Sequence, residues 1–289
     1  MNAHARLSLN HATIKHAPLD DAIRAARAAG IPSIGLWREP VAEVGLARAR
    51  ALVEASGLRV SSLCRGGFFT QVDDEERRRS LDDNRRAIEE TSLLASAGAE
   101  GSAAVLVLVA GGLPPGSRDL PGARERVRDA IAELEPDADA AGVTLALEPL
   151  HPMYASDRAV ISTLGQALDI AESFGPSVGV VVDTFHVWWD PDLMRQIARA
   201  GASRRIASYQ VCDWSTPLPS NVLLARHYPG DGVIDFASIT DAVEAAGYEG
   251  DIEVEIFNQD VWDDEWAAVA RRTADAFQSC VAPALSGQR

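Results

Sequence analysis

Val178-Gly179-Val180-Val181-Val182-Asp183 is an apolar run that shows no alternation of polar and apolar residues and that ends on a carboxylate. Apolar runs of this kind are typical of strands that are buried on both faces, and hence of a parallel sheet. Ala104-Val105-Leu106-Val107-Leu108-Val109 repeats the pattern earlier in the chain. The two runs therefore predict an α/β fold in which helices cover a parallel sheet.

Three further mainly apolar runs also end on a side chain that can bind a metal: Leu145-Ala146-Leu147-Glu148, Ala207-Ser208-Tyr209-Gln210 and Ile252-Glu253-Val254-Glu255. In a parallel barrel the carboxyl ends of the strands meet at one rim, so three carboxylates and one amide oxygen would share it. Carboxylates repel one another in a pocket of low dielectric constant unless a cation or shared protons relieve the repulsion. The sequence therefore predicts a bound divalent metal and, with it, an enzyme.

Predicted helices alternate with the strands along the whole chain. The first four strands are expected at 7–9, 33–36, 59–63 and 103–109, and the first four helices at 20–29, 41–56, 73–97 and 122–141. Three later helices are expected to begin at Ser156 with Asp157, at Asp190 with Pro191 and at Asp235, and to end before Gly175, Gly201 and Gly247. An eighth helix is expected at 264–281.

This alternation decides between two α/β architectures. Eight βα units give about 35 residues per unit, which is the spacing of a (β/α)8 TIM barrel. We therefore expect a single domain over residues 1–289, with the barrel at about 7–281 and a short C-terminal tail. A doubly wound open sheet would instead predict a glycine-rich phosphate-binding turn after an early strand, and ligands at one switch point. The sequence shows neither feature.

Composition and charge exclude several classes of protein. No apolar run approaches the roughly 20 residues of a membrane-spanning helix, and the formal net charge is −15. A negative field repels polyanions, so general binding to nucleic acid or acidic lipid is not expected. Cys64, Cys212 and Cys280 are too few and too far apart for a disulfide framework. Because residues 1–6 lack the apolar segment of a signal peptide, we expect a cytoplasmic protein.

Polar and aromatic side chains gather directly after the predicted strands. Five histidines do so, together with nearly all tryptophans: His11, His16, His151, His186 and His227. Barrel enzymes build their sites from the loops at the carboxyl ends of the strands, so this end is the expected active face, together with the glycine- and proline-rich loop at 110–116. A structural role is the alternative for single residues: Glu148 or Asp183 could cap a helix or meet an arginine, and His186 could be a satisfied polar side chain.

Several motifs resemble the xylose-isomerase-like TIM barrels: Leu147-Glu148-Pro149, Val182-Asp183-Thr184-Phe185-His186, Gln210-Val211-Cys212-Asp213, the run from Arg226 to Asp235, Gly247-Tyr248-Glu249-Gly250 and the run from Glu253 to Phe257. That superfamily includes sugar-phosphate isomerases and epimerases, ketose 3-epimerases, inosose dehydratases and endonuclease IV. The resemblance extends from about Val143 to Phe257 and is weak before Ala103. It implies one divalent metal held by Glu148, Asp183, Gln210 and Glu255.

Gln210 departs from the family pattern, in which the third ligand is more commonly a histidine. An amide oxygen makes the set of ligands all oxygen, which favours Mn²⁺ or Mg²⁺ over Zn²⁺. Glu253 points to the same side of its strand as Glu255, so the residues alone leave open which of them is the ligand. The family motif favours Glu255.

The resemblance implies an isomerase or epimerase that acts on a keto-sugar, an inosose or a related polyol. Glu148 and Glu255 would remove and return a proton next to a carbonyl group through a metal-bound enediolate. His186 is expected to take part in catalysis and to bind a substrate hydroxyl or a carboxylate. Arg226 would clamp the substrate, or would instead pair with Asp213 or Asp231. Apolar contact with the substrate is expected from the tryptophans Trp37, Trp188, Trp189 and Trp214.

The same residues also allow other functions to be considered. A lyase or dehydratase, acting by inosose dehydration or carbon-glycoside cleavage, would use the same metal and base. A non-catalytic barrel that binds a small molecule or serves as a partner subunit predicts loss of ligands, and Gln210 is the only sign of that. A nuclease like endonuclease IV needs additional histidines, whereas the second and third strands end in Trp37-Arg38-Glu39 and Cys64-Arg65-Gly66-Gly67. Members of the superfamily often form oligomers, so a homo-oligomer is allowed.

Overall fold

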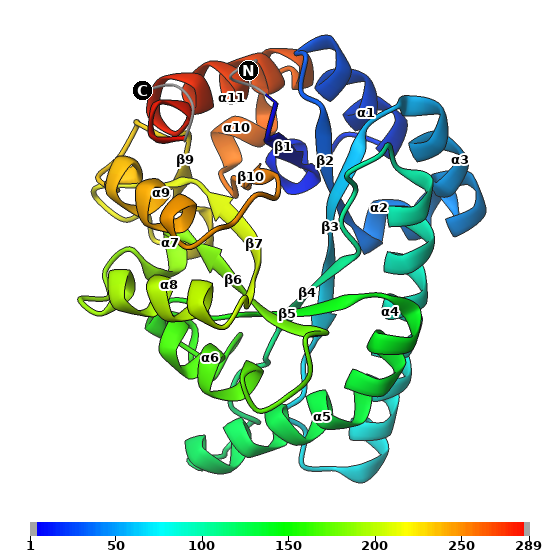
Figure 1. Cartoon of the computed structure of the whole chain (residues 1–289), viewed down its shortest axis with the longest axis vertical. Coiled ribbons are helices and arrows are strands. Elements are labelled where there is room, and N and C mark those ends of the chain that lie inside the picture. Colours follow the sequence, from blue (N-terminus) through cyan, green and yellow to red (C-terminus); the bar gives the residue numbers. More distant parts are fainter. Residues whose placement is uncertain (1–4, 286–289) are drawn as a thin grey trace.

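The computed structural model of the chain describes residues 5–285. Eight parallel strands close into a barrel in the order β1-β10-β7-β6-β5-β4-β3-β2, and helices surround it (Figure 1). The barrel strands are β1 (Leu7–Asn10), β2 (Ser33–Trp37), β3 (Arg59–Gly67), β4 (Val105–Val109), β5 (Thr144–Glu148), β6 (Val178–Asp183), β7 (Ile206–Val211) and β10 (Ile252–Val254). A separate antiparallel pair consists of β8 (Asp213–Trp214) and β9 (Arg226–His227). The predicted (β/α)8 barrel is confirmed.

The helices follow the strands in alternation. They are α1 (Leu19–Ala28), α2 (Arg38–Val44), α3 (Leu46–Ser56), α4 (Asp74–Ala97), α5 (Leu120–Ala141), α6 (Leu164–Ala171), α7 (Thr184–Val187), α8 (Leu193–Ala202), α9 (Phe236–Ala245), α10 (Gln259–Asp263) and α11 (Trp266–Cys280). Short 3-10 turns are η1 (His11–Ile14), η2 (Pro152–Tyr154), η3 (Val222–Leu224) and η4 (Ala282–Ala284). Part of the predicted C-terminal tail therefore forms η4, and residues 286–289 lie outside the described residues.

The helix predicted from Ser156 is wrong at its start. Thr163 caps the helix instead, because its hydroxyl accepts a hydrogen bond from the Gln166 N–H, and α6 begins at Leu164. The segment before it crosses to the neighbouring loop, where the Val160 N–H donates to the Gly111 carbonyl. Ser156 and Asp157 therefore lie in an exposed loop rather than in a helix.

Two further helices differ from the prediction. The helix expected at 41–56 is broken at Gly45, whose φ of 81° lies in the left-handed region that glycine adopts without strain. Asp190 accepts from the Asp192 N–H in a turn, so α8 begins only at Leu193. That helix also continues through Gly201 to Ala202.

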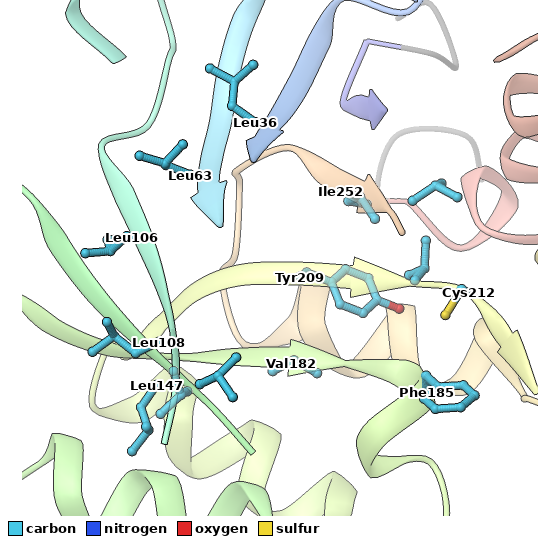
Figure 2. Packing of buried hydrophobic residues seen from close by; sticks show 14 of the residues in the cluster. Leu36, Leu63, Leu106, Leu108, Leu147, Val182, Phe185, Tyr209, Cys212 and Ile252 are labelled. Atoms are coloured by element: carbon cyan, nitrogen blue, oxygen red, sulfur yellow. The ribbon is translucent and has the colours of Figure 1, made fainter. Parts of the chain in front are cut away.

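The strands bury apolar side chains on both faces. Residues such as Leu106, Leu108 and Leu147 belong to the main core cluster (Figure 2). The same cluster contains helix side chains such as Ile131 and Leu134. A smaller cluster consists of the side chains that alternate with them: Cys64, Val105, Val107, Ala146 and Val181. These residues fill the barrel beside β3 to β6. The same alternation directs Glu148 and Asp183 into the barrel.

The other half of the barrel interior is polar. Glu253 on β10 accepts hydrogen bonds from Asn10, from the Ser61 hydroxyl at 2.5 Å and from the Ser62 hydroxyl at 2.9 Å. Gly35 on β2 makes room for this carboxyl, because a Cβ atom at that position would lie 2.4 Å from the carboxyl carbon of Glu253. Within residues 5–285, no helix combines the length and the apolar character needed to cross a membrane.

Candidate active site

The four predicted ligands all lie at the carboxyl ends of their strands. Glu148 and Asp183 are the last residues of β5 and β6, Gln210 is the last but one of β7, and Glu255 follows β10 directly. Each side chain is at most 5% exposed. A cavity of about 670 Å³ opens here, and Glu148 and Glu255 line it together with His186 and Arg226.

Glu148 and Asp183 lie close enough to bind the same metal ion. Donor atoms of Glu148, Asp183 and His186 all lie within 4.8 Å of one another. Burial, followed by the charges of Asp183 and Glu255, raises the pKa of Glu148 well above its ordinary value. Burial also raises the pKa of Asp183 to about 6, although the positive charge of Arg226 opposes it. Two buried carboxyls in contact favour either a shared proton or a cation.

Arg226 is the counter-charge of this cluster. Its guanidinium is buried, with Nη1 2.5 Å from Glu255 Oε2 and 3.4 Å from Asp183 Oδ2. The rings of Phe185 and Phe257 lie on it, with centroids 4.9 and 4.8 Å from its central carbon. The arginine therefore joins Glu255 to Asp183.

The predicted alternative, a pairing of Arg226 with Asp213 or Asp231, is wrong. The carboxylate of Asp213 accepts the backbone N–H groups of Gly230, Gly232 and Ile234, at 2.9, 2.8 and 3.0 Å. Asp231 pairs with Arg272 at 2.7 Å. Asp213 thus fixes the turn after β9, and Arg226 is left for the site.

His186 is a neutral hydrogen-bonding group. Burial, followed by the charge of Arg226, lowers its pKa well below the ordinary value. Its Nδ1 accepts from the His151 backbone N–H at 3.2 Å. A neutral imidazole has one N–H group, so this contact and the 3.0 Å contact of Nε2 with Arg226 Nη2 cannot both be hydrogen bonds. His186 lies beside Glu148 and Asp183, so its ring can contact either a substrate or an ion bound by these carboxylates.

Gln210 does not line the cavity and contacts the polar interior of the barrel. Its Nε2 donates to Glu253 Oε1 at 3.4 Å, whereas its Oε1 is buried and has no hydrogen-bond partner. Glu253 does not line the cavity, and burial raises its pKa to about 7. Of the two glutamates on this strand, Glu255 therefore faces the cavity, and Glu253 lies in the network of Asn10, Ser61 and Ser62.

The donor set fits a divalent cation on two observations. The first is the Gln210 Oε1, a buried acceptor that lacks a donor. The second is the charge balance, because three buried carboxylates face a single guanidinium. Such an imbalance is costly at low dielectric constant, and a dication would neutralise it. The residues that could hold the ion are Glu148, Asp183, Gln210 and Glu255.

The four tryptophans predicted to contact the substrate lie in two different places. Trp37 lines the cavity, whereas Trp188, Trp189 and Trp214 do not. Trp189 and Trp214 pack against His151, with ring centroids 5.5 and 5.1 Å from the centroid of its ring, and Trp188 packs against Trp214 at 5.4 Å. The Trp189 indole N–H donates to the carbonyl of His186 at 2.8 Å. Their contact is therefore with the segment that carries His186 rather than with the cavity.

Several cavity residues were not assigned to the site from sequence. His11 lines the cavity, and its Nε2 contacts the Ala17 carbonyl at 2.8 Å while its Nδ1 has no partner. Arg65, Tyr154 and Phe257 also line it. His11, Arg65 and Phe257 come at or just beyond the ends of barrel strands, so a search of every strand end would have found them.

Comparison with known proteins gives one family match. The family described as xylose isomerase-like TIM barrel matches residues 23–280. Among curated relatives, an inosose isomerase of Bacillus velezensis is 28% identical over 52% of this chain and 54% of its own length. An L-ribulose 3-epimerase of Mesorhizobium japonicum is 29% identical over 50% of this chain and 43% of its own length. The chain thus spans about half the length of the curated relatives it matches.

Solved structures match over nearly the whole chain. The crystal structure of protein SMc04130 from Sinorhizobium meliloti 1021 is 47% identical, with a TM-score of 0.91, and the match covers 96% of this chain and 99% of that one. A crystal structure of the IolI protein with a bound zinc atom is 20% identical, with a TM-score of 0.82, over 97% of this chain and 99% of that one. At that identity the second likeness concerns the fold alone.

Proposed function

This chain belongs to the xylose isomerase-like TIM barrel family, and on that premise we propose that it is a divalent-metal-dependent isomerase or epimerase of a keto-sugar, an inosose or a related polyol. The single observation that carries the proposal is that Glu148 and Glu255 line one cavity with His186 and Arg226. The curated relatives are named as an inosose isomerase and an L-ribulose 3-epimerase, which supports the same reaction class.

Glu148, Asp183, Gln210 and Glu255 would hold the metal. When bound, such an ion polarises a carbonyl and its neighbouring hydroxyl, and so acidifies the C–H bond between them. We propose Mn²⁺ or Mg²⁺ because all four donors are oxygens. The three thiols are free, and we propose the reducing cytoplasm as the compartment.

Glu148 and Glu255 each carry out one of the two proton transfers. Glu148, as a carboxylate, removes the proton from the carbon next to the carbonyl, and Glu255, as the acid, delivers a proton to the neighbouring carbon or to the opposite face. Delivery to the former carbonyl carbon, with transfer of the neighbouring hydroxyl proton to the former carbonyl oxygen, gives an isomer. Delivery to the original carbon from the opposite face gives an epimer. His186 forms a hydrogen bond with a substrate oxygen, and Arg226 orients the substrate through its N–H groups.

Proton exchange with solvent tests the proposal even when the product is unknown. Purified protein loaded with Mn²⁺ is incubated in D2O with a panel of ketoses and inososes, and NMR measures deuterium at the carbon next to the carbonyl. We expect exchange with at least one compound, and a loss of about 10²–10⁴-fold in Glu148→Gln and in Glu255→Gln. Glu253→Gln is the matched control and should keep the activity.

The same assay discriminates between the alternatives. Exchange accompanied by loss of water or of a leaving group would assign a lyase instead. Absence of exchange with every compound, or full activity in Glu148→Gln, would contradict the proposed function.

A further inference from the structure

His11 lines the active-site cavity, and the protons on its ring have a defined arrangement. The side chain is 1% exposed, and it belongs to η1, directly after β1. Its Nε2 lies 2.8 Å from the Ala17 carbonyl oxygen, which can only accept, so Nε2 carries a proton and donates. Burial lowers the pKa of His11, although the bond to Ala17 and the charge of Glu43 oppose the shift. A neutral imidazole has one N–H group, so Nδ1 is a bare acceptor.

This Nδ1 atom is buried beside the cavity. Within residues 5–285, no side chain or backbone group forms a hydrogen bond with it. A buried acceptor that lacks a donor costs free energy, and native proteins contain few of them. Because the ring borders the cavity, a molecule bound there can supply the donor. A ligand that displaces water from Nδ1 and has no donor of its own would lose affinity.

His11 and Glu148 lie on opposite sides of the barrel mouth. The strands close in the order β1-β10-β7-β6-β5-β4-β3-β2, so four steps separate β1 from β5 in either direction (Figure 1). Strand β10, which Glu255 follows directly, is the neighbour of β1. A molecule that contacts both glutamates therefore lies between Glu148 and the wall formed by β1 and β10, where His11 is located.

The turn that carries His11 is held in a fixed position relative to Glu255. The Thr13 hydroxyl donates to the Val254 carbonyl and accepts from the Ile256 N–H, both at 2.9 Å. One side chain of η1 thus binds the peptide groups on both sides of Glu255. Groups that are fixed before a ligand arrives lose little entropy when it binds. The acceptor on His11 is therefore preorganised beside one of the two proposed acid–base residues.

We propose that His11 is a specificity-determining residue, whose Nδ1 accepts a hydrogen bond from one hydroxyl group of the substrate. The substrate then needs a hydroxyl on the side of the molecule that faces β1 and β10. A deoxy analogue at that carbon leaves Nδ1 without a donor and binds more weakly. This inference rests on the proposed function, since it adds a requirement to the substrate class of the same site.

NMR of the ring nitrogens tests the state of His11 without any reaction. The full chain is isotope-labelled in its histidine rings and saturated with Mg²⁺, and the His11 signals are assigned by their loss in His11→Gln. We expect Nε2 to be protonated and Nδ1 to be unprotonated in the free protein. The probes are xylitol, ribitol, sorbitol and myo-inositol, which have no carbonyl group and cannot enolise. At least one should bind and shift the Nδ1 signal in the direction of a hydrogen-bonded acceptor.

Binding of the same polyols to variants tests the specificity. His11→Phe keeps a ring and removes the acceptor, so binding should weaken about tenfold. His11→Gln supplies an amide oxygen as acceptor and should stay within about threefold of wild type. His227→Phe is the matched control, because His227 is a half-buried histidine on β9 that does not line the cavity. It should bind the polyols like wild type.

Monodeoxy analogues of the polyol that binds identify the contact itself. One of them should bind wild type about tenfold more weakly than the parent polyol, and should bind His11→Phe about as well as the parent does. The inference is overturned if Nδ1 is protonated in the free protein, if no polyol shifts its signal, or if folded His11→Phe binds every polyol as tightly as wild type. Failure of the proposed function is seen separately: without proton exchange in any ketose or inosose the reaction is contradicted, whereas a shift of Nδ1 still supports this contact.

Discussion

Replacement of Glu253 by glutamine isolates the cost of burying one carboxyl inside the barrel. The side chain is 1% exposed, and burial raises its pKa from 4.5 to about 7. The variant keeps the size of the side chain and removes its ionisation. Asn10 can still donate to the amide oxygen, and the Ser61 and Ser62 hydroxyls can accept from the amide N–H groups.

The sign and size of the effect follow from proton linkage. In the unfolded chain Glu253 loses its proton near pH 4.5, whereas in the folded chain it keeps the proton up to about pH 7. The folded state therefore binds more protons in this window, and its stability falls as the pH rises through it. A difference of about 2.5 pKa units corresponds to about 3 kcal/mol at pH 8, and about 1 kcal/mol remains at pH 5.

Thermal unfolding of wild type and Glu253→Gln in EDTA, at several pH values from 5 to 8, measures this difference. EDTA removes any metal ion that would bind Glu148, Asp183 and Glu255 and so change their ionisation. For a chain of 289 residues, 3 kcal/mol corresponds to a Tm difference of about 5 °C. We expect the variant to gain in Tm relative to wild type as the pH rises, by about 4 °C between pH 5 and pH 8.

Glu255→Gln is the matched control, because it makes the same chemical change two residues along, where the carboxylate lines the cavity and contacts Arg226. It should lower proton exchange by about 10²–10⁴-fold, whereas Glu253→Gln should leave the exchange intact. A Tm difference between Glu253→Gln and wild type that stays constant within about 1 °C over the pH range would refute the reasoning about Glu253.

Gly35→Ala should lower stability by about 1–3 kcal/mol, because its Cβ would lie 2.4 Å from the Glu253 carboxyl carbon; in a double-mutant cycle with Glu253→Ala, strict additivity of the two losses would contradict this contact. Asp213→Ala removes the acceptor of three backbone N–H groups in the turn after β9 and should cost about 1–3 kcal/mol; an unchanged urea midpoint would argue against that role. Gln210→His should shift the metal preference at least about tenfold toward Zn²⁺ over Mn²⁺, since imidazole suits zinc. If competition dialysis finds the same Zn²⁺-to-Mn²⁺ preference in the variant and in wild type, Gln210 is not a ligand.

The sequence predicts the barrel well because its strands are buried on both faces and each ends on a recognisable residue. Glu148 and Asp183 end β5 and β6, and the alternation of side chains along a strand directs both into the barrel. Helix starts are less predictable where two capping residues compete, as Asp157 and Thr163 do before α6. The hydrogen bond from the Val160 N–H to the Gly111 carbonyl favours the later start at Thr163. A local sequence pattern cannot predict this bond, because its partners are far apart in the chain.

The site is only partly predictable from the sequence, because the residues that contact its side chains from other parts of the chain do not belong to the motifs. The choice between Glu253 and Glu255 depends on Asn10, Ser61 and Ser62, which come from strands far away in the sequence. The positions of Trp214 beside His151 and of Trp188 beside Trp214, rather than in the cavity, depend on how loops fold over one another. Residues at strand ends are predictable, whereas the direction of loop side chains is not.

Metal content of the purified chain tests the central claim most directly. After EDTA treatment and equilibrium dialysis against Mn²⁺, elemental analysis should find about one ion per wild-type chain and almost none in Glu148→Gln, while Glu253→Gln should bind like wild type. No ion in the wild type, or equal binding in wild type and Glu148→Gln, would contradict a cation held by Glu148, Asp183, Gln210 and Glu255.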